Sequence, residues 1–148
     1  MNVFIKAVEE SNWREIAALS VSADQRGFIE SNAQSLLEAA YDSTLQWHPL
    51  ALYHETTIVG FAMIGAKEGN KMWLDRFMIG AEFQRKGYGS LFMPLLIDHM
   101  KRHYQIARIY LSVHDENKKI IPYYQRFGFI DSQQYDLENG ERIMYLDA

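Results

Sequence analysis

The chain has 148 residues, of which 48% are hydrophobic and 23% charged, with a formal net charge of −4 at pH 7. This length and composition fit one globular domain, residues 1–148, and the negative charge argues against a nucleic-acid partner. We expect no membrane association and a cytoplasmic protein, because no apolar run approaches the roughly 18 residues of a membrane span and no signal peptide is apparent. The absence of cysteine excludes disulfides and thiolate zinc sites.

The hydrophobic pattern predicts strands and helices in the order β-α-α-β-β-β-α-β-α-β-β, a mixed α/β (α+β) fold with a largely antiparallel first half. Strands are expected at residues 3–7, 50–53, 58–64, 72–79, 106–113, 129–135 and 142–146. Two short helices are expected after Asn12 and Ser31, and longer ones at 90–104 and 117–127, the last ended by Gly128. Pro94 and Pro122 fall inside the last two and make their boundaries uncertain.

Two segments have the spacing of a helix N-terminal cap, Asn12 with Glu15 and Ser31 with Gln34. In the first helix, Ile16 belongs to the expected apolar face. The apolar face expected for the second helix consists of Leu36, Leu37, Ala40 and Tyr41.

The segment Gln84–Gly89 (QRKGYG) is a glycine-bearing turn between an expected strand and an expected helix. Glycine lets the backbone approach oxyanions, and the free amides of a helix N-terminus point at them, so the segment predicts a phosphate cradle. It is not a Walker loop, because no lysine follows Gly89, and not a Rossmann fingerprint, because Phe92 stands where a third glycine or alanine is required. A purely structural turn is the alternative.

A second motif lies in residues 117–129, where Asn117 opens an expected helix, Tyr124 follows, and Gly128 and Phe129 close it. Together with Q-x-x-G-x-G, this motif resembles the Gcn5-related N-acetyltransferase (GNAT) superfamily over residues 50 to 130. The resemblance implies the GNAT fold, a mostly antiparallel central sheet flanked by helices. It also implies acetyl-CoA as cosubstrate, whose pyrophosphate the first motif binds, and a homodimer, because GNATs are often dimers.

Three short segments are similar to bacterial spermine/spermidine acetyltransferases of the BltD type: 28–31 (FIES), 73–77 (WLDRF) and 124–129 (YQRFGF). This narrower resemblance implies acetyl transfer to a primary amine of a polyamine, by direct attack of the amine on the thioester. The alternatives are another amine, such as a protein N-terminus, an amino acid or an aminoglycoside, and a module that binds acetyl-CoA without turnover.

By the same resemblance, the CoA contacts come from the strand before the loop, from the loop and from the second motif. The implied residues are Phe77, Met78, Ile79, Gln84, Arg85, Lys86, Gly87, Tyr88, Gly89, Ser90, Asn117 and Tyr124. A backbone amide near Met78 or Ile79 is expected to stabilise the oxyanion. For Arg85 and Lys86, simple solvation in a surface loop is the alternative.

Tyr124 occupies the family's position for the donor to the leaving thiolate, with Tyr123 about 100° round the helix. Its helical spacing with Ile120 and Phe127 also fits a core residue. Asp75 is expected on the apolar strand face of Trp73, Phe77 and Ile79, where it would accept the proton of the substrate ammonium. A buried pair with an arginine or lysine is the alternative for Asp75.

A polyamine needs further carboxylates for its distal ammonium groups, and Glu30 is singled out because it lies in the FIES segment. Solvated surface charge is the alternative for Glu30. The other candidates are Glu38, Asp42 and Glu55, with Tyr41, Trp47 and Tyr53 as aromatic faces for a cation. His99 and His103 have the spacing of a metal pair but no evident third ligand, so no metal is expected.

Overall fold

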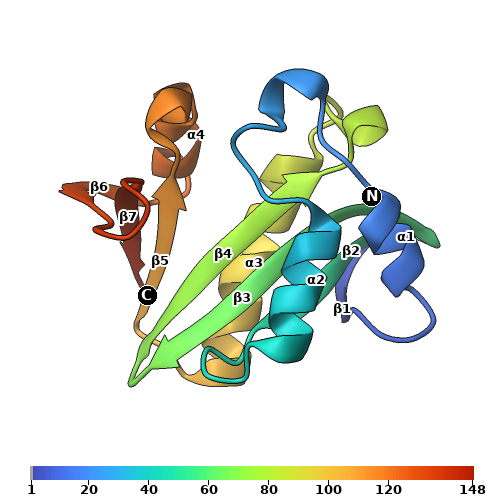
Figure 1. Cartoon of the computed structure of the whole chain (residues 1–148), viewed down its shortest axis with the longest axis horizontal. Coiled ribbons are helices and arrows are strands. Elements are labelled where there is room, and N and C mark those ends of the chain that lie inside the picture. The colour runs from blue at the N-terminus through green and yellow to red at the C-terminus, as the bar shows by residue number, and fades with distance from the viewer. Residues whose placement is uncertain (1) are drawn as a thin grey trace.

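The computed structural model describes residues 2–148 and contains a seven-stranded sheet of order β1-β2-β3-β4-β5-β7-β6 (Figure 1). The strands are β1 Val3–Ala7, β2 His48–His54, β3 Thr57–Glu68, β4 Lys71–Ile79, β5 Arg108–Val113, β6 Ile130–Tyr135 and β7 Arg142–Asp147. The helices are α1 Trp13–Ala18, α2 Asn32–Tyr41, α3 Tyr88–Tyr104 and α4 Ile121–Gln125, with 3-10 turns η1 Ala23–Gln25, η2 Ala81–Phe83 and η3 Asp115–Ile120. Neighbouring strands are antiparallel except β4 and β5. The predicted fold class and element order are confirmed.

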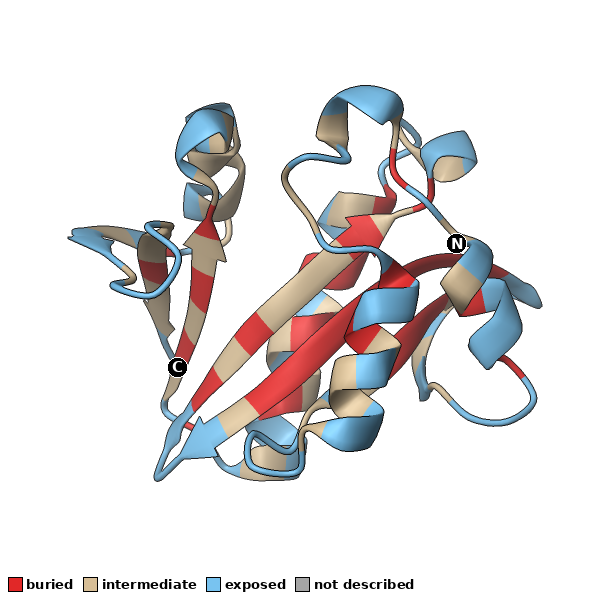
Figure 2. Cartoon of the chain, viewed as in Figure 1, coloured by how far each residue is buried: buried red, intermediate tan, exposed pale blue. Residues whose placement is uncertain are grey.

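The sheet has a separate core on each face. On one face, Phe92 and Leu96 of α3 pack with residues of β2 to β5. On the other face, Ile16 of α1 packs with Phe61 and Met63 of β3. β3 is therefore covered on both sides and buried along most of its length (Figure 2), which explains its nearly continuous apolar run.

Helix α2 presents a different face to the sheet than its apolar pattern predicts. The cap is confirmed, since Ser31 Oγ accepts a hydrogen bond from the Gln34 amide at 3.1 Å. The buried residues, however, are Asn32 and Ser35, while Leu37 is 55% and Tyr41 84% exposed. Asn32 Nδ2 donates to the Ile16 and Leu19 carbonyls at 2.9 and 3.3 Å, satisfying the end of α1, and of the four predicted apolar residues only Leu36 packs against the core, half-buried.

Helix α1 begins directly after Asn12 as predicted but lacks the expected side-chain cap, and the helix start predicted at Asn117 is wrong. Asn12 makes no side-chain cap to α1, because its Oδ1 accepts from the Glu9 amide at 2.7 Å instead. Asn117 does not open a helix, since it lies inside the 3-10 turn η3 with non-helical φ/ψ of −111° and 31°. The α-helix begins later, where Pro122 occupies the first turn and its missing N–H costs no hydrogen bond.

Strand β4 carries a bulge at Asp75 that changes which residues share a face. Met63 of β3 pairs with Arg76 and the next residue, Ile64, pairs with Leu74, so Asp75 is the extra residue. As a result, Phe77 lies on the α3 side together with Leu74 rather than on a common face with Asp75. The predicted strict alternation along residues 72–79 is therefore wrong beyond Leu74.

Candidate active site

Strands β4 and β5 separate part-way along their length and open a cleft. They pair only through Lys71–Arg108, Met72–Ile109 and Trp73–Tyr110, after which they diverge (Figure 1). The resulting cleft has a volume of about 650 Å³ and is lined by β4, β5, η3, α4 and the segment around η1. Its size is that of an ordinary small-molecule site.

The cleft brings together many of the residues expected to contact CoA, from both sequence motifs. Of the expected set, Phe77, Met78, Ile79, Gln84, Gly89, Asn117 and Tyr124 line it. The remaining five, Arg85, Lys86, Gly87, Tyr88 and Ser90, do not line it but lie in the adjoining loop and first turn of α3. The two motifs, far apart in the chain, thus border one cleft.

The loop before α3 has the geometry of an anion cradle. Gly87, at φ +85°, precedes Tyr88, the first residue of α3. Leu91 donates to the Gly87 carbonyl at 3.3 Å, so the amides of Gly89 and Ser90 precede this first helical bond and are available to a ligand. A Cβ atom at Gly87 would meet nothing within 4 Å, so this side of the loop is open.

Two residues of the loop use their side chains to hold it in place. Tyr88 is buried, and its hydroxyl lies 2.6 Å from His54 Nδ1. Gln84 Nε2 donates to the Ile79 carbonyl and to Gln25 Oε1, both at 2.9 Å. The side chains of Tyr88 and Gln84 therefore position the cradle and the end of β4.

Both neighbouring tyrosines of α4, Tyr123 and Tyr124, line the cleft. Burial raises the pKa of Tyr124. Burial also raises the pKa of Tyr123 to about 12. The Tyr123 hydroxyl is buried without a hydrogen-bond partner among residues 2–148, and a Cβ at Gly89 would lie only 2.8 Å from it. Both hydroxyls are protonated at neutral pH and are therefore hydrogen-bond donors.

Asp75 faces the cleft and is also part of a half-buried ion pair. Its carboxylate pairs with Arg76, whose second nitrogen lies 3.3 Å from Glu38 Oε2. Burial raises the pKa of Asp75, the Arg76 charge opposes that shift, and Glu38 and Glu141 add to it. The pair with an arginine, given in the sequence analysis as the alternative role of Asp75, is therefore present. Asp75 nevertheless lines the cleft.

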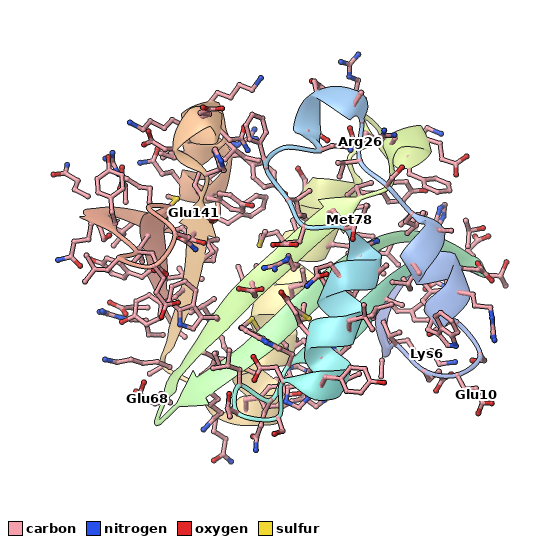
Figure 3. All side chains as sticks on the ribbon, viewed as in Figure 1. Lys6, Glu10, Arg26, Glu68, Met78 and Glu141 are labelled. Atoms are coloured by element: carbon pink, nitrogen blue, oxygen red, sulfur yellow. The ribbon has the colours of Figure 1, made fainter. Side chains whose placement is uncertain are left out.

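Glu141 is a cleft residue that sequence reasoning missed. It lies just before β7, on the β5–β7 side of the cleft (Figure 3), and accepts a hydrogen bond from Ser112 Oγ at 2.8 Å. In the sequence it is one carboxylate in a polar turn, with no motif around it. Only the pairing of β5 with β7 brings it to the cleft.

Comparison with known proteins decides the family. A family model described as "Acetyltransferase (GNAT) family" matches residues 13–129. The chain belongs to the GNAT acetyltransferase family. Membership confirms the expectation of an acetyl-CoA-dependent N-acetyltransferase, with acetyl-CoA as cosubstrate.

The relatives of this GNAT protein include polyamine acetyltransferases. The spermine/spermidine N(1)-acetyltransferase of Bacillus subtilis (strain 168) is 40% identical over 151 residues, which cover 97% of each chain. Among solved structures, spermidine N-acetyltransferase from Vibrio cholerae, in complex with CoA and spermine, has a TM-score of 0.74 at 16% identity, covering 98% of this chain and 95% of the other. An N-acetyltransferase from Thermoplasma acidophilum, in complex with coenzyme A, has a TM-score of 0.73 at 21% identity over the whole of both chains. These two structures confirm the fold.

Charged residues of both signs border the GNAT cleft. Toward the loop, the pKa of Asp24 is lowered by the Ser22 hydroxyl and further by the charges of Lys119 and Arg85. Around the β4 bulge, carboxylates outnumber the single guanidinium of Arg76. A cleft of this kind suits an anionic cofactor at one end and a cationic substrate at the other.

The remaining candidates of the sequence analysis have varied positions. Glu30 lines the cleft, whereas Glu38 reaches it only through Arg76, and Asp42 and Glu55 do not line it. The three aromatic candidates for a cation site also lie outside the lining: Tyr41, Trp47 and Tyr53.

The His99 and His103 rings stack 4.3 Å apart, and residues 2–148 contain no group of three or more potential metal ligands. No helix in that range is long and apolar enough to span a membrane.

Proposed function

We propose that this acetyltransferase transfers the acetyl group of acetyl-CoA to a primary amine of a polyamine such as spermidine or spermine. The observation that carries the proposal is the carboxylate-rich end of the cleft, which is lined by Asp75 and Glu141 and where Glu38 acts on Asp75 from behind Arg76. The 40% identity to a spermine/spermidine acetyltransferase supports the same substrate class. We further propose a single-domain cytoplasmic enzyme that forms homodimers, as is common in the family.

Acetyl-CoA would bind at the loop end of the cleft. Its pyrophosphate would accept hydrogen bonds from the amides at the start of α3, assisted by the partial positive charge of the helix N-terminus. Beyond Trp73, β4 no longer pairs with β5, so no strand covers that edge at Phe77–Ile79, where Gln84 binds only the Ile79 carbonyl. The pantetheine arm would add there as an extra strand.

The transfer itself removes two protons from the amine nitrogen and adds one to the leaving sulfur. An aliphatic ammonium has a pKa of about 10, so the amine must lose a proton before it attacks, and Asp75 would accept that proton directly or through water. The amine nitrogen would then bond to the thioester carbonyl carbon, and the oxyanion would be stabilised by the amide of Met78 or Ile79, worth about 3 kcal/mol. When the C–S bond breaks, the Tyr124 hydroxyl would give its proton to the CoA thiolate, and the second proton lost by the amine nitrogen would restore the Tyr124 phenol.

A coupled thiol-release assay tests this function, with acetyl-CoA and a panel of spermidine, spermine, lysine and an aminoglycoside. We expect kcat/KM for the two polyamines to exceed that for lysine and the aminoglycoside at least tenfold, about 1.4 kcal/mol in transition-state stabilisation. A preference for lysine or the aminoglycoside would reject the polyamine assignment. Thiol release no faster than background with every amine would reject the enzymatic proposal.

A further inference from the structure

Glu141 is held more firmly than a surface turn residue. Its Oε1 accepts from Ser112 Oγ at 2.8 Å, its amide donates to Asn139 Oδ1 at 2.8 Å, and its carbonyl accepts from the Asp136 amide at 2.8 Å. These contacts fix both the backbone and the carboxylate of Glu141 on the wall of the cleft. A fixed carboxylate loses little conformational entropy when it binds a cation.

The charge of Glu141 is not neutralised by the basic residues around it. The adjacent Arg142 is bound by Asp131 through two hydrogen bonds of 2.8 and 2.7 Å. Arg76, the guanidinium that lines the cleft, is engaged by Asp75 and Glu38. Across residues 2–148, no ion pair within 4 Å involves Glu141.

Glu141 and Asp75 reach the cleft from different sides of the opening between the strands. Asp75 lies on the bulge of β4, and Glu141 precedes β7, which pairs with β5. The two carboxylates are close enough for Glu141 to affect the titration of Asp75. An amine positioned by Asp75 therefore has a second, unpaired anionic group within the same cleft.

We propose that Glu141 binds the second ammonium group of a di- or polyamine and thereby selects polyamines over monoamines. This inference rests on the proposed function, since it assumes that the reacting nitrogen lies near Asp75. Glu141 takes no part in bond making or breaking; it contributes binding energy for a cation carried elsewhere on the same substrate. A monoamine with one nitrogen at Asp75 would leave Glu141 without a ligand.

The kinetic test compares Glu141→Gln with Glu138→Gln in the same turn. Glutamine keeps an oxygen for the Ser112 hydrogen bond but removes the charge, and Glu138 is exposed and outside the cleft lining. We expect Glu141→Gln to lower kcat/KM for spermidine at least tenfold, mainly through KM, while kcat/KM for butylamine changes less than twofold. Glu138→Gln should match wild type with both amines. An unchanged kcat/KM for spermidine, or equal losses with both amines, would overturn the assignment.

Calorimetric titration of spermine into the CoA-loaded protein tests the same point without turnover. We expect Kd to rise at least tenfold in Glu141→Gln and to stay unchanged in Glu138→Gln. If spermine binding depends on Glu141 but the protein releases no thiol, the proposed function is refuted and the role of Glu141 in binding stands. Polyamine turnover with equal spermine binding by wild type and Glu141→Gln would refute only the role of Glu141. No spermine binding by the wild-type protein would overturn the inference.

Discussion

Gly60 allows β3 and β4 to approach each other where the oxyanion amides are expected. It lies in β3 opposite Ile79. A Cβ atom at this position would lie 2.5 Å from the Met78 carbonyl oxygen and 3.0 Å from Ile79 Cδ1. Contacts shorter than 3.0 Å are essentially never seen for real Cβ atoms, so Gly60→Ala must move the Met78 peptide by at least about half an ångström.

That displacement should affect catalysis more than stability. Overpacking of this kind costs about 1–3 kcal/mol of unfolding free energy, which leaves a domain of ordinary stability folded. A shift of the oxyanion-binding amides by up to about 1 Å should lower kcat by about 10- to 100-fold, because stabilisation of the transition state depends on where these donors lie.

The assay combines thiol-release kinetics with urea unfolding of Gly60→Ala and of a control, Gly27→Ala. A Cβ atom at Gly27 would meet nothing within 4 Å, so the control should keep wild-type kcat and change stability by less than about 0.5 kcal/mol. If a folded Gly60→Ala protein keeps wild-type kcat, the reasoning that the Met78–Ile79 backbone must be held in place is wrong.

Three further substitutions test the other parts of the proposed mechanism. Tyr124→Phe should lower kcat by about 100-fold with little change in acetyl-CoA affinity by calorimetry, and an unaltered kcat would exclude the proton-donor role. Gly87→Val places a branched side chain at φ +85° on the open side of the loop, so we expect CoA to bind at least about tenfold more weakly. A folded variant with wild-type CoA affinity would reject the role of this loop as a phosphate cradle. The pKa of Asp75 is raised in the folded protein, so its protonated form stabilises the fold at low pH and this contribution disappears as the pH rises through that pKa. The Tm of Asp75→Asn relative to wild type should therefore increase as the pH rises above about 4, the ordinary pKa of an aspartate, and a constant difference would contradict the burial of this charge.

Local features were predictable from the sequence because short-range physics determines them. The order of strands and helices, the Ser31 cap and the glycine turn before α3 depend on residues a few positions apart, and the structure confirms each of them. The two motifs were also recognisable in the sequence, because each is a short contiguous segment. Together these local features indicated the order of elements and the family.

Errors arose where tertiary contacts prevailed over a local preference. Apolar spacing favoured burial of Leu37 and Tyr41, but the hydrogen bonds from Asn32 to the end of α1 turned them outward. Strict alternation failed at Asp75, because a bulge depends on the register with the neighbouring strand and not on the strand's own sequence.

The sequence alone therefore indicated the elements, the glycine-bearing loop before α3 and the acetyltransferase family. The tertiary structure alone decided how the far end of the cleft is built: the divergence of β4 from β5, the Asp75–Arg76–Glu38 contacts, and the approach of Glu141. The physical reason is that strand order and register bring together residues that are distant in the chain, and no local pattern encodes which carboxylates will meet. These long-range contacts are the ones from which we infer how the amine is chosen.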